Sequence, residues 1–326
     1  MIISKTPYRI SFFGGGSDYP EWYLKNGGEV ISSTINKYLY ISCRELSDFF
    51  SHKYRIIYSK MEEVGKIEQI KHRVVRLILL KYKIKKNLEI HYNGDLPARS
   101  GMGSSSSFIV GLLNAINNFQ DYNISKTKLA YDSIFLEQKI LKECVGSQDQ
   151  VACSFGGFNS IKFRENNTFQ VNKLDKSNVF KKNLNKNLIL LYTGKQRTAE
   201  KVAMRFIKRI NSVKKQEIKD ILGLVKVAKD LINKLDYYSF GQLLDESWKI
   251  KKKLDKGITN NFLDDIYNKA KFNGAIGGKI LGAGAGGFFL FYVPEEAKKY
   301  FINKMSFLTH VPFAFENEGS QIIYKN

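Results

Sequence analysis

The chain has 326 residues, 43% of them hydrophobic and 25% charged, a composition that indicates a folded globular protein and excludes an intrinsically disordered one. Its three cysteines include no Cys-x-x-Cys pair, which argues against a disulfide framework and a thiolate metal site. The net charge of +21 comes mostly from lysines spread along the chain. This pattern favours a diffuse lysine excess over a nucleic-acid-binding patch, which would need clustered arginine and aromatic residues.

The length exceeds the usual size of one hydrophobic core, so we expect two domains around a cleft. Polar runs at 164–167 and 181–187 predict exposed turns, and we place the division between residues 1–180 and 181–326. No stretch is long and apolar enough to span a bilayer, and the start of the chain lacks the features of a signal peptide. We therefore expect a cytoplasmic protein without membrane or nucleic-acid partners, and a homodimer stays open.

The N-terminal residues predict a strand over 2–13 that leads into a glycine loop at 14–16. Within this strand Arg9 has apolar neighbours, so its guanidinium must find an anion or a carboxylate. Asp18 follows the glycines, either as a ligand-binding residue or as a turn residue that caps its own backbone. Alternating residues at 31–43 and 54–58 predict further strands of a mixed sheet, with a loop over 25–29.

The central stretch, residues 97–113, is Pro-Ala-Arg-Ser-Gly-Met-Gly-Ser-Ser-Ser-Ser-Phe-Ile-Val-Gly-Leu-Leu. It predicts a loop and first helical turn over Gly101–Ser107, followed by a helix that runs toward Phe119. A helix N-terminus with glycines and serines is a binding site for phosphate. The alternative is an ordinary helix capped by serine. Before it we expect an amphipathic helix over 62–84 and a strand over 88–92.

Two acidic residues stand out after this helix. Ser125 is a plausible cap of a further helix that carries Glu137, and Asp149 lies in the segment from Gly146 to Gly157. By residue type alone, Glu137 could be a solvated helix residue and Asp149 a turn residue. An ionised Asp can take the proton of an attacking hydroxyl, and a nearby Arg keeps it ionised. Arg9 is the candidate partner.

The second half predicts a strand over 188–192, helices over 199–254, a helix over 295–301 and a closing strand over 321–324. Lys195 and Arg197 follow the first of these strands, as phosphate ligands or as solvated residues of a helix start. A third glycine stretch, 274–287, leads into an apolar strand rather than a helix, so its Gly-x-Gly-x-x-Gly spacing is not a dinucleotide-binding loop.

The three glycine stretches, in this order, resemble the superfamily of galactokinase, homoserine kinase, mevalonate kinase and phosphomevalonate kinase, the GHMP kinases. Its second motif, Pro-x-x-x-Gly-Leu-Gly-Ser-Ser, matches Pro97 to Ser105 with Met102 in place of Leu. The resemblance implies an α+β fold with an N-terminal domain like domain 2 of ribosomal protein S5 and a ferredoxin-like C-terminal domain. It also implies an ATP-dependent kinase with a small-molecule hydroxyl acceptor.

The same resemblance implies roles for individual residues. Asp149 and Arg9 would be the catalytic pair, and Glu137 with Ser105 would hold Mg²⁺, with Ser104 and Glu143 as alternatives. The residues implied to bind ATP are Pro97, Arg99, Gly101, Met102, Gly103, Ser104, Ser105 and Ser106. Those implied to contact the acceptor are Gly15, Gly16, Ser17, Asp18, Lys195, Arg197 and Gly284.

The acceptor itself is suggested by the first motif. The galactokinase branch has Gly-Glu-His-Thr-Asp-Tyr where this chain has Gly14-Gly-Gly-Ser-Asp-Tyr19, which keeps the sugar-binding Asp and weakens the match to galactose. Residues 6–20 and 146–150 most resemble bacterial heptose 7-phosphate kinases. That family makes the 1,7-bisphosphate of D-glycero-D-manno-heptose for nucleotide-activated heptose and surface polysaccharide. The alternatives are another anomeric sugar kinase, fucose- or galactose-like, and a non-catalytic sugar or nucleotide sensor.

Overall fold

The computed structural model describes residues 1–174, 178–195 and 200–326, with the side chains of residues 200 and 201 excepted. Within these residues the larger of two sheets has nine strands: β13-β1-β2-β5-β3-β4 lie side by side, β6 and β12 pair with β2, and β7 pairs with β6. Its strands are β1 (Ile2–Phe13), β2 (Gly28–Glu45), β3 (Tyr54–Ile57), β4 (Met61–Val64), β5 (Leu88–Gly94), β6 (Phe158–Phe163), β7 (Phe169–Lys173), β12 (Phe315–Glu316) and β13 (Gln321–Lys325).

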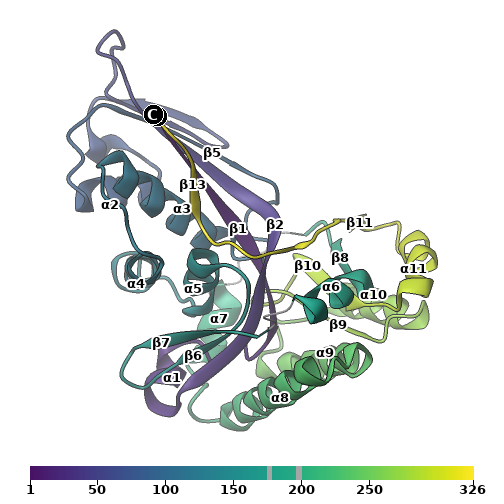
Figure 1. Ribbon diagram of the computed structural model, residues 1–326. Helices are drawn as coiled ribbons and strands as arrows, with labels where there is room; N and C mark the ends of the chain where they lie inside the picture. The colour runs from purple at the N-terminus through teal and green to yellow at the C-terminus, as the bar shows by residue number, and fades with distance from the viewer. Residues whose placement is uncertain (175–177, 196–199) are drawn as a thin grey trace.

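The antiparallel pair of β1 and β2 forms the frame of the molecule, as Figure 1 shows. β2 is 18 residues long, so its C-terminal part pairs with β5 and its N-terminal part with β6. Most of β1 is buried, because helices cover it and β13 pairs with its first residues. This burial places Arg9, in the middle of β1, inside the protein.

The helices of the first half pack around α3, which lies against β1 and β2. Every residue from Ser106 to Asn118 is buried, as expected of a helix that is apolar on all sides. As predicted, Ser125 caps the next helix by accepting a hydrogen bond from the N–H of Lys128 at 3.2 Å. The helices of the first half are α1 (Pro20–Asn26), α2 (Arg73–Lys81), α3 (Ser104–Phe119), α4 (Lys126–Phe135) and α5 (Gln148–Phe155), of which α2, α4 and α5 contact α3.

The second sheet is antiparallel, with the order β11-β8-β10-β9 among the described residues. Its strands are β8 (Leu188–Tyr192), β9 (Gly277–Ile280), β10 (Phe288–Tyr292) and β11 (Thr309–His310). The helices around it are α6 (Val179–Asn187), α7 (Glu200–Ile207), α8 (Lys215–Lys234), α9 (Tyr237–Leu254), α10 (Asn261–Phe272) and α11 (Lys298–Lys304).

This sheet is buried on both faces, which the alternation of its side chains shows. Phe288 and Leu290 of β10 belong to one apolar cluster, which extends into the large sheet, while Phe289 and Phe291 belong to a second cluster with α10 and α11. Successive side chains of a strand point to opposite faces. Such a strand needs apolar residues at every position, so the run Phe288–Val293 predicted it well.

Three local predictions are wrong. The helix expected over 62–84 begins only at Arg73, because residues 61–64 form β4 and the carboxylate of Glu62 accepts hydrogen bonds from the backbone N–H groups of Lys71 and His72. The segment 181–187, expected as an exposed turn, lies in α6, and Lys181 is buried with its amine donating to Asn317. The loop expected from residue 25 instead begins after α1 ends at Asn26.

The last strand returns to the first. β13 pairs with the start of β1 and β12 pairs with β2, although both follow the second sheet in the chain. The C-terminus therefore lies at the far end of the large sheet in Figure 1. The division between residues 1–180 and 181–326 stays a prediction.

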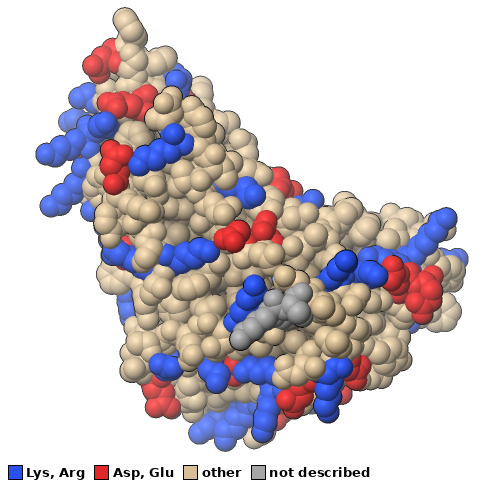
Figure 2. Space-filling view, viewed as in Figure 1, with Lys and Arg blue, Asp and Glu red and all other residues tan. Residues whose placement is uncertain are grey.

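The surface charges are dispersed. Figure 2 shows lysine and arginine side chains at both ends and along the lower edge of the molecule, interrupted by acidic groups, rather than in one continuous patch on this face. Among the described residues, no helix is long and apolar enough to cross a membrane.

Candidate active site

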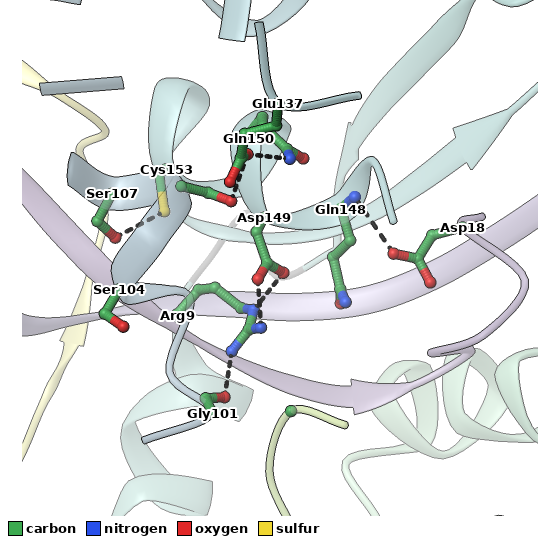
Figure 3. A network of polar contacts seen from close by, with 12 residues as sticks. Arg9, Asp18, Gly101, Ser104, Ser107, Glu137, Gln148, Asp149, Gln150 and Cys153 are labelled. Atoms are coloured by element: carbon green, nitrogen blue, oxygen red, sulfur yellow. Dashed lines mark hydrogen bonds and ion pairs between the residues drawn. The ribbon is translucent and has the colours of Figure 1, made fainter. Parts of the chain in front are cut away.

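Arg9 and Asp149 form a bidentate ion pair at the centre of Figure 3. Arg9 Nε donates to Asp149 Oδ1 at 2.7 Å and a terminal nitrogen donates to Oδ2 at 2.6 Å. Arg9 is 4% exposed, and its pKa is raised because the attraction of Asp149 outweighs the burial that lowers it. The pair joins β1 to the first turn of α5 and leaves the carboxylate partly open to solvent. The predicted juxtaposition is therefore present.

The start of α3 does not have the serine cap that was the alternative prediction. Its N-cap residue is Gly103, in a left-handed conformation, and no side chain of the described residues caps the helix. The Oγ of Ser104 instead accepts a hydrogen bond from the backbone N–H of Arg99 at 3.1 Å. The first N–H groups of the helix are therefore available to a ligand. The loop is tied to Arg9, which donates to Gly101 O at 2.8 Å.

Asp18 links the first glycine loop to the Asp149 segment. Its Oδ1 accepts a hydrogen bond from Gly16 N–H at 2.9 Å, and its Oδ2 accepts one from Gln148 N–H at 3.3 Å. Burial raises the pKa of Asp18 to about 6, and these backbone hydrogen bonds oppose that rise. Only glycine fits at 146, because a Cβ there would overlap the Asp18 carboxylate. Asp18 thus both caps its own loop and borders the site.

Glu137 lies in a π-helical segment, η2 (Leu136–Ile140), directly after α4. It is fully buried, and its Oε2 accepts hydrogen bonds from Ser106 Oγ at 2.7 Å and from Gln150. Its Oε1 has no hydrogen-bond partner among the described residues. Burial raises the pKa of Glu137 to about 8, against the effect of these two donors. A buried carboxylate with one free oxygen is a suitable ligand for a cation.

These groups border one cavity of about 430 Å³. Its walls come from β1, the first glycine loop, the start of α3, the segment 143–149, α7 and α9, and the third glycine stretch. The second and third stretches touch each other, since a Cβ on Gly101 would overlap the carbonyl of Leu281. The open start of α3, the Arg9–Asp149 pair and Asp18 therefore all face the same cavity, so a nucleotide and an acceptor bound there together would meet all three.

Two family models match the chain. The model of the GHMP kinases N terminal domain matches residues 69–157, and that of the GHMP kinases C terminal domain matches residues 228–306. Together they cover more than half of the chain. The chain belongs to the GHMP kinase family.

Sugar kinases are among the relatives of this GHMP kinase. D-glycero-alpha-D-manno-heptose 7-phosphate kinase of Campylobacter jejuni is 29% identical over 310 residues, which cover 92% of this chain and 91% of that protein. Galactokinase of Pyrococcus furiosus is 24% identical over 91% of this chain and 90% of that protein. The crystal structure of a D-glycero-D-manno-heptose 1-phosphate kinase from Bacteroides thetaiotaomicron has a TM-score of 0.79 and 25% identity, and the match covers 100% of both chains.

These matches confirm the predicted α+β fold of the GHMP kinases. They also confirm that the protein is an ATP-dependent kinase with a sugar hydroxyl as acceptor. The matches do not single out one sugar as the acceptor, because two of these relatives are named for heptose phosphates and one for galactose.

The cavity brings together most of the predicted site residues of this GHMP kinase. Besides Arg9 and Asp149, the predicted residues that line it are Gly15, Gly16, Asp18, Arg99, Gly101, Gly103, Ser104, Ser105, Ser106 and Glu137. Their individual roles stay predictions. For the metal, the serine that Glu137 contacts is Ser106, whereas Ser105 and Ser104 were the expected partners.

Other predicted residues do not line the cavity. Met102 is fully buried, with its carbonyl accepting from Arg9 N–H at 3.1 Å, and Ser17 is buried and holds the first glycine loop. Lys195 is exposed, with its amine 4.0 Å from the ring centre of Phe262. Pro97 and Gly284 are likewise absent from the cavity wall. Arg197 lies outside the described residues.

The sequence analysis did not identify two cationic residues of the cavity, Lys251 on α9 and Lys279 on β9. Lys251 is hidden in a run of lysines that is typical of a solvated helix face. Lys279 carried a usable signal, because it interrupts the apolar strand between Ile276 and Leu281.

Proposed function

We propose that this kinase transfers the γ-phosphoryl group of ATP to the anomeric hydroxyl of D-glycero-D-manno-heptose 7-phosphate, giving the 1,7-bisphosphate. The observation that carries the proposal is the cavity in which the Arg9–Asp149 pair faces the uncapped start of α3 and the Asp18 loop. The choice of sugar is supported by the first glycine motif and by the heptose 7-phosphate kinase relative.

In this reaction the anomeric oxygen forms a bond to the γ-phosphorus, the bond from that phosphorus to the β-bridging oxygen breaks, and ADP leaves. The hydroxyl proton is released as the new bond forms, and Asp149 is the acidic group placed to accept it. Arg9 orients the Asp149 carboxylate through two hydrogen bonds and adds positive charge where negative charge spreads over the transferred group.

The triphosphate would lie on the N–H groups at the start of α3, between the second and third glycine stretches. Among the described residues, no group of three or more His, Cys, Asp or Glu side chains could hold a metal alone. Mg²⁺ needs few protein ligands when phosphate oxygens supply the others, and the free Oε1 of Glu137 beside Ser106 fits that role. When bound, the ion would neutralise phosphate charge.

Replacing Glu137 with glutamine tests this metal role. The amide has the size of the carboxyl group but no charge, so we expect the Mg²⁺ concentration at half-maximal rate to rise about tenfold or more. The affinity for Mn²⁺ in the presence of ADP, measured by electron paramagnetic resonance, should fall by a similar factor. Glu143→Gln is the matched control from the same cavity wall. A larger effect at Glu143 than at Glu137 would move the metal role to Glu143.

The acceptor would bind over Asp18, and the pKa of this residue predicts how pH affects acceptor binding. Because its pKa is raised to about 6, Asp18 is ionised at pH 7.5 and protonated at pH 5. An ionised carboxylate accepts hydrogen bonds from sugar hydroxyls and a protonated one accepts fewer. The KM for the sugar should therefore rise, by up to about tenfold per pH unit, as the pH falls below 6.

In Asp18→Asn the KM should be high, and the pH dependence that remains between pH 5 and pH 7.5 should be only that of the acceptor phosphate, because the side chain no longer titrates in this range. An equal pH dependence of the sugar KM in the wild type and in Asp18→Asn would remove Asp18 from acceptor binding.

The proposed function is tested by ADP release with Mg-ATP across free and phosphorylated hexoses and heptoses. We expect turnover with heptose 7-phosphate at a kcat/KM at least about a hundredfold above that of any free hexose, since a bound phosphate adds charge-assisted hydrogen bonds. Preferred turnover of fucose or galactose would keep the enzyme class and replace the proposed acceptor.

A further inference from the structure

The cavity wall holds four cationic side chains, and among the described residues only that of Arg9 forms an ion pair with a carboxylate of the wall, while Arg99 is exposed. Lys251 of α9 and Lys279 of β9 line it together with Arg9, although all three come from different elements. Arg9 is paired with Asp149. Among the described residues, neither lysine forms an ion pair with a carboxylate, and Asp18, Glu137 and Glu143 complete the acidic groups of the wall.

Lys279 is held by neutral groups only. It is 5% exposed, and its Nζ donates to the backbone oxygen of Phe12 at 2.6 Å and to Ser247 Oγ at 3.3 Å. An ammonium group has three donors, so one N–H is left for a ligand. Burial lowers the pKa of Lys279 to about 7, and the charge of Arg9 lowers it further.

Lys251 is held in the same way. Its Nζ donates to the backbone oxygen of Ile280 at 2.8 Å and to that of Gly282, and one N–H again remains. Burial lowers the pKa of Lys251 well below its usual value, and the charges of Lys279 and Arg9 add to this effect. These contacts fix both ammonium groups beside the third glycine stretch. In this region Gly282 of the third stretch touches Gly101 of the second glycine stretch.

The buried ammonium group of Lys279 and the partly buried one of Lys251 are costly without a carboxylate, and a bound anion lowers that cost. A tetrahedral phosphoryl group suits the place, because it offers several acceptor oxygens to donors that converge from two elements. The anion-binding start of α3 borders the same cavity.

We propose that Lys251 and Lys279 form a binding site for one phosphoryl group at the end of the cavity nearest to Arg9. The two sources of such a group, the terminal phosphate of ATP and the phosphate of the acceptor, follow from the proposed function, on which this inference rests. The site itself would bind either one through the same chemistry.

Calorimetry with Lys251→Met and Lys279→Met separates the two sources, with Lys253→Met as the control on the exposed face of the same helix. The ligand pairs are ADP against the β,γ-imido analogue of ATP, and free heptose against heptose 7-phosphate. We expect each cavity variant to bind the phosphate-bearing ligand of one pair about tenfold or more weakly than the wild type does. The other ligand of that pair, which lacks the phosphate, should bind with wild-type affinity. The pair affected identifies the source. Equal affinities of wild type and variants for all four ligands, or equal losses within both pairs, would overturn the proposal.

A second measurement does not depend on how well the methionine variants fold. Because the pKa of Lys279 is about 7, a phosphoryl group bound beside it should raise that pKa and draw a proton from solution at pH 7. Titrating the wild type in two buffers of different ionisation heat should show more protons taken up with the phosphate-bearing ligand than with its counterpart, once the protons released by the phosphate itself are subtracted. Lys279→Arg should keep the affinity and lose this uptake. Equal uptake for both members of each pair would contradict the site.

The nucleotide pair also keeps this test distinct from that of the proposed function. If no heptose 7-phosphate is phosphorylated, the proposed acceptor fails, while the comparison of ADP with the ATP analogue still tests the two lysines.

Discussion

Replacing Asp149 with asparagine should lower kcat by about 10³-fold, within the range that removal of a general base produces. The amide cannot accept the proton of the sugar hydroxyl, although it has nearly the same shape. Binding of ADP and of the ATP analogue should change less than about threefold, because the start of α3 is untouched. Steady-state kinetics and calorimetry measure the two effects separately.

The same substitution leaves Arg9 buried beside a neutral side chain, which should lower the free energy of unfolding by about 3 kcal/mol. The assay must therefore be run well below the unfolding temperature of the variant. Asp132→Asn is the matched control, since it makes the same change at a surface ion pair of α4 and should keep wild-type kcat. A kcat of Asp149→Asn within about threefold of wild type would remove Asp149 from the chemistry.

Arg9→Lys should lower kcat by about a hundredfold even though it keeps the charge. Arg9 makes two parallel hydrogen bonds to Asp149 and a third to Gly101 O, so it fixes both the carboxylate and the loop before α3. A lysine offers a single point charge and cannot reproduce this planar fork.

Arg44→Lys provides the control for the chemistry of the substitution. Arg44 lies on β2 and makes a similar two-bonded pair with Glu89, but it is exposed and far from the cavity wall. It should show wild-type kinetics. If Arg9→Lys does as well, positive charge alone is sufficient at this position and the fork geometry is unimportant.

The part of the site predicted from the sequence is the part in which local chemistry leaves few choices. An arginine on an apolar strand must find a carboxylate, and a run of Gly and Ser before an apolar helix favours an open helix start. Both expectations match the positions of Arg9 and Gly103. Because adjacent helix residues differ in direction by about 100°, the sequence could not tell which serine faces Glu137, and Ser106 rather than Ser105 does so.

Lys251 could not be assigned because its environment depends on distant contacts, whereas Lys279 could have been noticed as a charged residue within an apolar strand. Lys251 resembles its solvated neighbours in the sequence, and only the packing of α9 against β9 turns it toward the cavity. Similarly, the helix predicted over 62–84 was shortened by Glu62, whose carboxylate binds backbone groups nine and ten residues further along the chain. Such tertiary hydrogen bonds override local periodicity.

The most direct test of the account is a phosphorus NMR spectrum of the wild-type protein with Mg-ATP and D-glycero-D-manno-heptose 7-phosphate. We expect ADP to form together with a second sugar phosphate signal that couples to the anomeric proton, one for each ATP consumed. ATP consumption without this signal, a new phosphate on another carbon, or no reaction under conditions in which ATP binds would contradict the proposed function.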